Sequence, residues 1–320
     1  MAEIERYSNI NVVKIIDTAL YIEIPENLDS IQSLKSITGT YLTIQGSNLN
    51  PHFISKHKSI LGSLIEQILK GTKESFKTYK LSCAGSDTKE VKSLNRFIGD
   101  TYKLIPAEDA DMEIYIGKQG SIWEIGVRSL PRPLSVRDYR VANIPGGLNS
   151  TVAYAMNTYA TTTVHPHRYL NIFSGSATLL LEAVSFFDTV ELVGFDANGK
   201  TNALAIQNIK KAGKLKSIQL KTADIFSKPQ LGTFDSITSD LPFGMKISKG
   251  EDIEKLYRCF VEYCEESLAS NGTLVVYTTE HELLKSILLE SKFIIHKEIQ
   301  LKIPASLNAY IYPKIFVCGR

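Results

Sequence analysis

The sequence predicts an α/β protein with a doubly wound, mostly parallel sheet in its C-terminal part, preceded by an α+β region. Strand and helix signals alternate from about residue 169 to the end of the chain, which is typical of a sheet whose strands are joined by helices. Ahead of them, Leu130–Leu134 contains two prolines and separates this alternation from shorter, less regular elements. The length of 320 residues suits about two domains of ordinary size.

The composition is that of an ordinary soluble globular protein. The net charge of +2 is nearly balanced, so any surface that binds nucleic acid must be local. The four cysteines form no C-x-x-C pair, so we expect reduced thiols and a cytoplasmic location. The first residues contain no apolar core of a secretory signal, and no apolar run approaches the ~20 residues that span a bilayer. No metal is expected.

Residues 1–50 are interpreted as a small α+β unit. Leu28, Ile31, Leu34 and Ile37 recur at intervals of three, which favours a helix over 28–37. Short apolar runs predict strands at 11–16, 19–24 and 41–44. Nothing in this segment carries obvious chemistry, so a packing module is the simplest interpretation.

A second α+β unit is predicted from residue 51 to about 140. Apolar residues at helical intervals follow Pro51 and stop at Gly71, a suitable C-terminal cap, and another helix begins near Lys89. Further apolar runs predict strands at 79–84, 112–116 and 122–127. Lys56 and Lys58 lie on the polar side of the first helix. We favour a solvated helix face there, and the alternative is a surface that meets phosphates.

From residue 143 onward the elements become regular. A helix capped by Asn149 or Ser150 comes first. Strands are then predicted at 169–173, 190–195, 218–222, 234–239 and 273–278, and helices at 177–187, 200–212, 254–269 and 281–291. The last two strands, 293–302 and 310–318, are predicted to form an antiparallel hairpin at one edge of the sheet.

Four loops in this part follow predicted strands, and ligands of open parallel sheets bind beyond those strand ends. The loops begin with Phe173-Ser174-Gly175-Ser176-Ala177-Thr178, at Asp196, with Ala223-Asp224-Ile225, and at Asp240. Small residues in the first loop let a ligand approach the backbone. Asp196 can accept hydrogen bonds from both hydroxyls of a ribose. Asp224 can meet the amino group of an adenine.

The fourth loop, Asp240-Leu241-Pro242-Phe243-Gly244, offers a compact set of groups. The Asp240 carboxylate and a backbone carbonyl can accept hydrogen bonds from an exocyclic amine, and Phe243 presents a flat face to a planar base. Pro242 stiffens the turn. Such a site could hold an amine lone pair toward an electrophilic methyl group.

Each loop taken alone also has an ordinary structural explanation. Pro-Phe-Gly after a strand is commonly a turn, Gly175 can cap a turn, and Asp196 and Asp224 can cap helices. Together, in order and at a spacing that suits a nucleoside, the four loops favour one binding site.

These residues carry a resemblance to a known family. Residues 141–320 look like a class I S-adenosylmethionine-dependent methyltransferase, and Asp240-Leu241-Pro242-Phe243 resembles the (D/N)-P-P-(Y/F/W)-type motif of amino-group methyltransferases. The segment from Tyr139 to Ala153, followed by Ser174–Thr178 and Glu182-Ala183, is similar to THUMP-domain RNA guanine-N2 methyltransferases. Upstream, 111–140 is similar to the end of a THUMP domain, and 1–50 is compatible with a preceding ferredoxin-like domain.

The resemblance implies a fold, a cofactor and a substrate. S-adenosylmethionine would be bound by Asn171, Phe173, Ser174, Gly175, Ser176, Thr178, Asp196, Asp224 and Ile225. A guanine flipped out of RNA, most simply tRNA or else rRNA, would stack on Phe243 and donate its N2 hydrogens to Asp240 and the Leu241 carbonyl beside Pro242. RNA phosphates would be held by Lys56, Lys58, Arg132, Arg137 and Arg140. Arg137 and Arg140 serve equally well as ion-pair partners in the linker.

Two positions depart from the family. Asn171 stands where an aspartate is usual, and Ala177 replaces a second glycine; Glu182 is a candidate for the missing carboxylate. One alternative is therefore a catalytically degenerate RNA-binding protein with this fold. Another is an amino-group methyltransferase that acts on adenine or on a protein glutamine. The THUMP-like half of the chain favours RNA.

Overall fold

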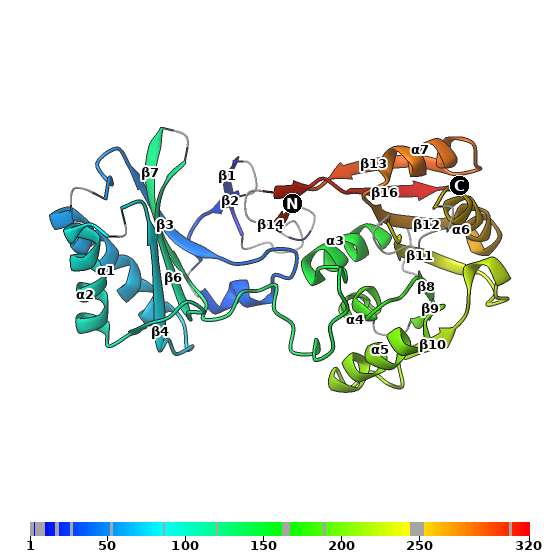
Figure 1. Ribbon diagram of the computed structural model, residues 1–320, viewed down its shortest axis with the longest axis horizontal. Helices are drawn as coiled ribbons and strands as arrows, with labels where there is room; N and C mark the ends of the chain where they lie inside the picture. Colours follow the sequence, from blue (N-terminus) through cyan, green and yellow to red (C-terminus); the bar gives the residue numbers. More distant parts are fainter. Residues whose placement is uncertain are drawn as a thin grey trace. The chain divides into compact units, whose positions relative to one another are not determined.

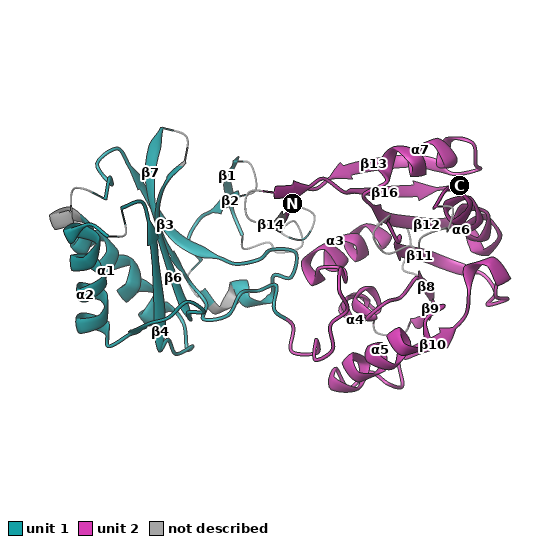
Figure 2. Cartoon of the chain, viewed as in Figure 1, with its two compact units in different colours: residues 1–136 teal, residues 137–320 magenta. Residues whose placement is uncertain are grey.

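The structure is a computed structural model, and its chain divides into two compact units, Met1–Val136 and Arg137–Arg320 (Figure 2). For residues 29, 30, 54–56, 119, 305 and 306 the structure describes the backbone but not the side chain. The structure describes residue 3 and residues 10–16, 19–25, 28–51, 54–85, 87–119, 121–161, 167–187, 190–243, 253–306 and 309–320.

The second unit is built on a seven-stranded sheet with the order β10-β9-β8-β11-β12-β16-β13 (Figure 1). The strands from β10 to β12 in this order are parallel, and β16 is antiparallel to both of its neighbours. The strands are β8 (Arg168–Ile172), β9 (Glu191–Asp196), β10 (Ile218–Thr222), β11 (Phe234–Asp240), β12 (Leu268–Thr278), β13 (Ile294–Gln300) and β16 (Lys314–Gly319). The predicted doubly wound α/β fold is confirmed.

The edge of this sheet differs in one detail from the prediction. β13 and β16 pair antiparallel as expected, but β16 lies between β12 and β13, so β13 forms the edge. The segment that joins them contains a small hairpin of its own, β14 (Ile303–Ser306) paired with β15 (Ala309–Ile311).

Helices cover both faces of the sheet because successive strand residues point to opposite sides. On one face, Tyr169 and Leu192 pack with residues of α3 (Ser150–Ala160), α4 (Thr178–Ala183) and α5 (Gly199–Lys211). On the other face, Leu170 and Val193 pack with residues of α6 (Ile253–Ser267) and α7 (His281–Leu289). The predicted helix over 177–187 is shorter in the structure, where α4 ends at Ala183 and turns follow.

The first unit contains a five-stranded sheet with the order β3-β7-β6-β4-β5. Helices α1 and α2 contribute to the core that covers this sheet. A separate hairpin pairs β1 with β2. The elements are β1 (Val12–Ile16), β2 (Ala19–Ile22), β3 (Tyr41–Gly46), α1 (Ile54–Gly71), β4 (Thr78–Cys83), α2 (Lys89–Tyr102), β5 (Ile105–Pro106), β6 (Met112–Gln119) and β7 (Ile122–Arg128).

The helix expected over 28–37 is a shorter 3-10 helix, Leu28–Ser33, and β5 was not predicted. β3 comes from the segment predicted as ferredoxin-like, and it pairs antiparallel with β7 from the segment predicted as THUMP-like. The two names for the segments 1–50 and 51–140 remain predictions. Among the described residues, no helix is both long enough and apolar enough to cross a membrane.

Candidate nucleoside and methyl-transfer site

A cavity of about 500 Å³ lies in the second unit, beyond the carboxyl ends of β8, β9 and β11. The order of the strands reverses between β8 and β11, since β9 and β10 are added on one side and β12 on the other. Such a reversal leaves room between the loops that follow the strands. Every residue expected to bind the cofactor lines this cavity: Asn171, Phe173, Ser174, Gly175, Ser176, Thr178, Asp196, Asp224 and Ile225.

The loop after β8 is shaped by alternate residues in the left-handed region. Phe173, Gly175 and Ala177 have φ of 55°, 52° and 63°. The Ala177 N–H donates to the Ser174 carbonyl at 2.8 Å, and the Ser174 N–H donates to the Phe195 carbonyl at 3.0 Å. The first bond closes a turn within the loop and the second ties the loop to β9, while its small side chains leave the backbone open to the cavity.

Two buried polar atoms at the base of the cavity have no partner among the described residues. They are Oδ1 of Asn171 and Oγ of Ser174. The Asn171 residue is 1% exposed and the Ser174 residue 5%. The Asn171 amide nitrogen donates to the Thr238 carbonyl at 3.1 Å and to the Ile172 carbonyl at 3.2 Å. Those bonds fix the amide so that its oxygen remains available. A buried acceptor without a partner costs about 1–3 kcal/mol, a cost that a ligand with an N–H or O–H donor would remove.

Two carboxylates lie on other walls of the cavity. Asp196 accepts from the Gly175 N–H at 3.1 Å through one oxygen and from the Asn198 N–H at 2.9 Å through the other. Each oxygen of the Asp196 carboxylate can accept a second hydrogen bond, so this one carboxylate can still bind two hydroxyls. Asp224 is exposed and caps a short 3-10 helix, Ile225–Ser227, by accepting from the Phe226 N–H at 3.0 Å.

The Asp240–Phe243 loop is held by its backbone. The Leu241 N–H donates to the Tyr277 carbonyl at 3.0 Å, and the Tyr257 hydroxyl donates to the Pro242 carbonyl at 3.0 Å. Burial raises the pKa of Tyr257, so its phenol keeps the proton that it donates. Asp240 and Pro242 line the cavity, whereas the Leu241 side chain is fully buried in the core. Gly244 lies outside the described residues.

Glu182 does not supply a carboxylate to the cavity. It is 2% exposed and pairs with Arg137, with Nε to Oε1 at 2.8 Å and Nη2 to Oε2 at 3.2 Å. The Tyr139 hydroxyl also donates to Oε1 at 2.6 Å. Burial and the charge of Glu182 raise the pKa of Tyr139, which therefore stays protonated. Glu182 thus anchors the linker, and the suggestion that it replaces the missing aspartate is wrong.

The residues expected to bind RNA phosphates have different surroundings. Arg137 forms an ion pair with Glu182, which agrees with the alternative to phosphate binding given for it above. Arg140 donates from Nε to Asn143 Oδ1 at 2.8 Å. Arg132 is exposed and Lys58 is half-buried in α1. The side chain of Lys56 lies outside the description. A role in RNA binding remains a prediction for all five residues.

Asn208 was missed by the sequence analysis. It is fully buried in α5, and its Oδ1 accepts from the N–H groups of Val141 at 3.0 Å and Ala142 at 2.8 Å. Its amide donates to the carbonyls of Ala142 at 2.9 Å and Ser176 at 3.2 Å. One side chain therefore joins residues 141 and 142 to the loop after β8. The segment that follows residue 142 contributes Ile144, Pro145, Gly147 and Leu148 to the cavity wall.

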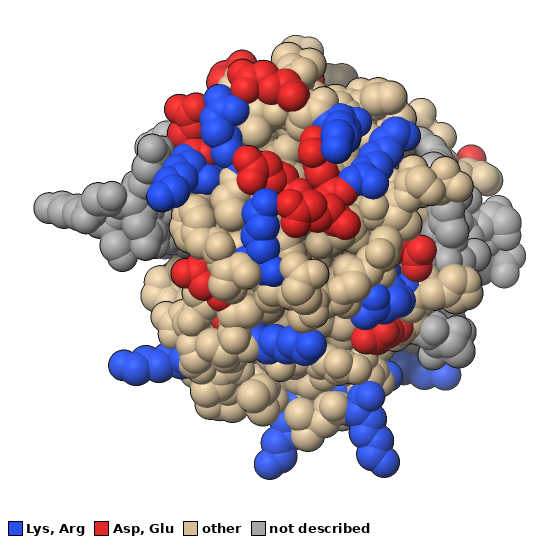
Figure 3. All heavy atoms as spheres, turned by 90° about the vertical axis from the view of Figure 1, so that its right-hand side faces the viewer, with Lys and Arg blue, Asp and Glu red and all other residues tan. Residues whose placement is uncertain are grey.

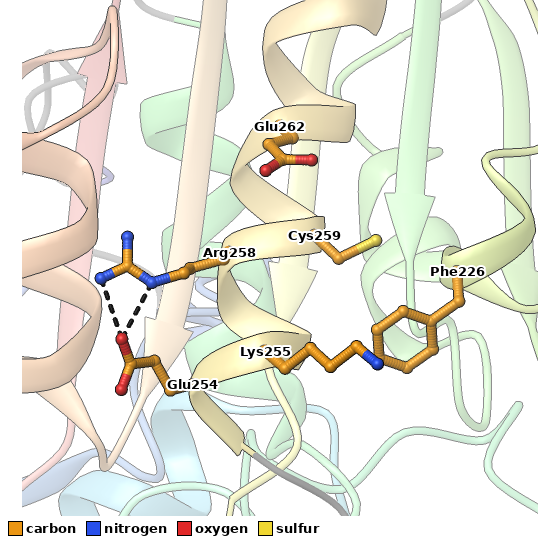
Figure 4. Close-up of a pocket in the computed structure, with 6 residues that line it drawn as sticks. All are labelled: Phe226, Glu254, Lys255, Arg258, Cys259 and Glu262. Atoms are coloured by element: carbon orange, nitrogen blue, oxygen red, sulfur yellow. Dashed lines mark hydrogen bonds and ion pairs between the residues drawn. The ribbon is translucent and has the colours of Figure 1, made fainter.

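A second hollow, of about 590 Å³, lies beside α6 and shares Phe226 with the cavity (Figure 4). Its charged groups are engaged: Arg258 pairs with Glu254 at 2.9 Å, and Lys255 lies 5.6 Å from the centre of the Phe226 ring. Burial raises the pKa of the Cys259 thiol, which makes it a poor nucleophile at neutral pH. The described residues that line this hollow therefore offer no activated nucleophile.

The parallel sheet with an antiparallel strand inserted next to its edge, and the cavity at its reversal point, define a Rossmann-like methyltransferase fold. TrmN from Thermus thermophilus matches it with a TM-score of 0.76 at 19% identity, over 99% of this chain and 93% of that one. SMU.472, a putative methyltransferase complexed with SAH, matches with a TM-score of 0.68 at 11% identity, over 99% and 93%. At these identities the likeness concerns the fold.

The chain belongs to the RMKL-like, methyltransferase domain family (UPF0020), whose profile matches residues 137–308. It is 29% identical over 220 residues to the U6 snRNA (guanine-N(2))-methyltransferase THUMPD2 of Bos taurus, covering 65% of this chain and 42% of that protein. It is 25% identical over 205 residues to the tRNA (guanine(6)-N2)-methyltransferase of Archaeoglobus fulgidus, covering 56% and 50%. The matches thus span half or less of these relatives.

Replacing Asn208 tests its role as a clamp. Asn208→Leu keeps the volume but leaves the Val141, Ala142 and Ser176 backbone groups without this partner, so we expect a loss of about 2 kcal/mol or more in the free energy of unfolding. Denaturant unfolding measures the loss. The control is Gln207→Leu, at the exposed position next to Asn208 in the same helix. This substitution should change the free energy of unfolding by less than about 0.5 kcal/mol. Equal effects of the two substitutions would contradict the clamp.

Replacing Ala177 tests the strain in the loop after β8. A left-handed conformation costs an L-residue about 1–2 kcal/mol, and the greater freedom of glycine in the unfolded chain offsets about 0.5–1 kcal/mol of any gain. Ala177→Gly should therefore preserve the free energy of unfolding or raise it by up to about 1 kcal/mol, in a urea titration. The β-branched Ala177→Val should lower it. A clear loss of stability in the glycine variant would refute strain at this position.

Proposed function

We propose that this protein is an S-adenosylmethionine-dependent methyltransferase that acts on an exocyclic amino group of RNA, namely N2 of a guanine in tRNA or another structured RNA. The observation that carries the proposal is the cavity in which unpartnered acceptors, two carboxylates and the Asp240–Pro242 turn come together. The similarity to the bovine and archaeal relatives, both named as guanine-N2 methyltransferases of RNA, supports the choice of substrate.

The residues of the cavity fit the donor chemically. Asn171 Oδ1 and Ser174 Oγ would accept hydrogen bonds from the ammonium group of its amino acid moiety. Asp196 would bind the two ribose hydroxyls, and Asp224 would accept from the adenine amino group beside the apolar Ile225. When bound, S-adenosylmethionine supplies a methyl group on a positively charged sulfur. Asn171 brings no charge, so the ammonium group is held by hydrogen bonds instead of an ion pair.

The fourth loop would position the acceptor. Asp240 and the Leu241 carbonyl would accept the two N2 hydrogens, which turns the nitrogen lone pair toward the methyl group. Pro242 holds the turn through its bond from Tyr257, and Phe243 would stack on the flipped base. Transfer is an in-line displacement in which alignment and exclusion of water provide most of the acceleration. The bond to the amine nitrogen forms as the carbon–sulfur bond breaks, and the nitrogen loses a proton afterwards, so no general base has to act before the methyl group is transferred.

The first unit would hold the rest of the RNA through phosphates, with Lys56, Lys58 and Arg132 as candidates.

The described cysteines, Cys83, Cys259, Cys264 and Cys318, are all free thiols, which suits our proposal of a cytoplasmic location.

Asp240→Asn tests the assignment of the acceptor site. The amide keeps the shape but replaces one acceptor oxygen with a donor, so we expect methyl transfer to fall at least about 100-fold, as for other polar groups that act on a reacting centre. Donor affinity should change less than about threefold. Transfer of labelled methyl to unmodified tRNA transcripts, followed by nucleoside analysis, measures both rate and product.

The matched control is Asp235→Asn, because Asp235 lies at the opposite end of β11 and accepts from the His167 and Arg168 N–H groups. It should retain transfer. We expect N2-methylguanosine as the product of the wild type. Methylated adenine or protein glutamine would overturn the proposed substrate, and donor binding without any transfer would indicate the degenerate RNA-binding protein.

A further inference from the structure

The second unit carries a band of lysines along α5 and β10 that the proposed site does not use. Residues 199–222 contain six lysines and no acidic residue. Five are exposed and Lys214 is half-buried. The band consists of Lys200, Lys210, Lys211, Lys214, Lys216 and Lys221.

Several other described lysines of the same unit form ion pairs with carboxylates, and the lysines of the band do not. Lys228 pairs with Glu266 at 2.7 Å, Lys285 with Glu298 at 2.7 Å, and Lys314 with Glu298 at 3.2 Å. Among the described residues, no ion pair joins a lysine of the band to a carboxylate. The charge of Lys221 helps to lower the pKa of Glu191, but that carboxylate is held by Arg168 at 2.7 Å.

The same separation of charges is visible on the surface. Figure 3 shows the face on which acidic side chains gather in the upper part, interleaved with basic ones. In its lowest part, where Figure 1 places α5 and β10, basic side chains project without such neighbours. Uncompensated charges of one sign on a protein that is nearly neutral overall mark a local field that attracts a polyanion.

The band begins at the cavity and leads away from it. Asn198 and Thr201, on either side of Lys200, line the cavity, and Lys221 adjoins Thr222, which pairs with Asp196 in the sheet. Lys210 and Lys211 end the 13-residue helix α5, about 16 Å beyond Lys200 along the helix at 1.5 Å per residue. Over that length a nucleic acid backbone presents several phosphates.

We propose that this lysine band binds the phosphate backbone of the substrate RNA where the RNA leaves the catalytic cavity. The inference rests on the proposed RNA substrate and adds a binding surface on the catalytic unit itself, independent of the N-terminal unit. The lysines fit the evenly spaced charges of a nucleic acid backbone. They contact phosphates without reading bases, so the band contributes affinity and register without sequence preference.

The test removes four charges far from the cavity in the full-length chain, by combining Lys210→Ala, Lys211→Ala, Lys214→Ala and Lys216→Ala. Binding of fluorescently labelled unmodified tRNA transcript is measured between 50 and 200 mM salt. Each lost phosphate contact should make the dependence of log affinity on log salt shallower by about 0.7–0.9, so we expect a change of about 3 and at least a tenfold loss of affinity at 100 mM salt.

The control removes the same charge from the same unit by combining Lys228→Ala, Lys285→Ala, Lys292→Ala and Lys314→Ala, whose lysines all form ion pairs. It should bind tRNA within about threefold of the wild type. Titration with S-adenosylmethionine and thermal unfolding establish that both variants are folded. Unchanged tRNA binding in the band variant, or an equal loss in the control, would overturn the lysine band while leaving the proposed function intact. Absence of tRNA binding by the wild type would instead overturn tRNA as the proposed substrate, and the band as a tRNA-binding surface with it.

Discussion

The reversal of strand order between β8 and β11 is the constraint on which the rest of the second unit depends. Because β9 and β10 are added on one side of β8 while β11 and β12 are added on the other, the loops that follow these strands diverge. The cavity occupies the space between them. Residues 171, 196, 224 and 240 are far apart in the sequence, and parallel pairing alone brings their strand ends to one edge of the sheet.

The walls of the cavity are stabilised chiefly by buried polar side chains that bond to backbone. Asn208 fastens residues 141 and 142 to the loop after β8, Asn202 donates to the Lys221 carbonyl at 3.1 Å, and Tyr257 holds the Pro242 carbonyl. The N–H and O–H donors of these three side chains are bonded within the protein, although Asn202 Oδ1 has no partner among the described residues. Asn171 Oδ1 and Ser174 Oγ also lack a partner there, and unlike Asn202 they belong to residues that line the cavity. The difference separates the frame of the site from the surface that a ligand completes.

Much of this could be predicted from the sequence. The alternation of strand and helix signals located the strands of the large sheet, and the rule that ligands bind at carboxyl ends selected the loops that line the cavity. The position of β16 between β12 and β13 could not be predicted, because spatial order within a sheet is set by packing and not by chain order. Asn208 was missed since an asparagine inside a helical pattern looks like any solvated polar residue. Glu182 was misjudged for a related reason: its partner Arg137 lies 45 residues away along the chain.

The most direct test of the account is calorimetric titration of S-adenosylmethionine into the protein and its Asp196→Ala variant. The matched control is Asp235→Ala, which removes a carboxylate that accepts two backbone N–H groups at the other end of the sheet. The account predicts micromolar binding by the wild type and by the control, and a loss of at least about tenfold in Asp196→Ala, as expected when hydrogen bonds to a charged group worth roughly 1.5–3 kcal/mol are removed. No binding by the wild type at millimolar donor, or equal binding by all three proteins, would contradict the assignment of the cavity as a methyl-donor site.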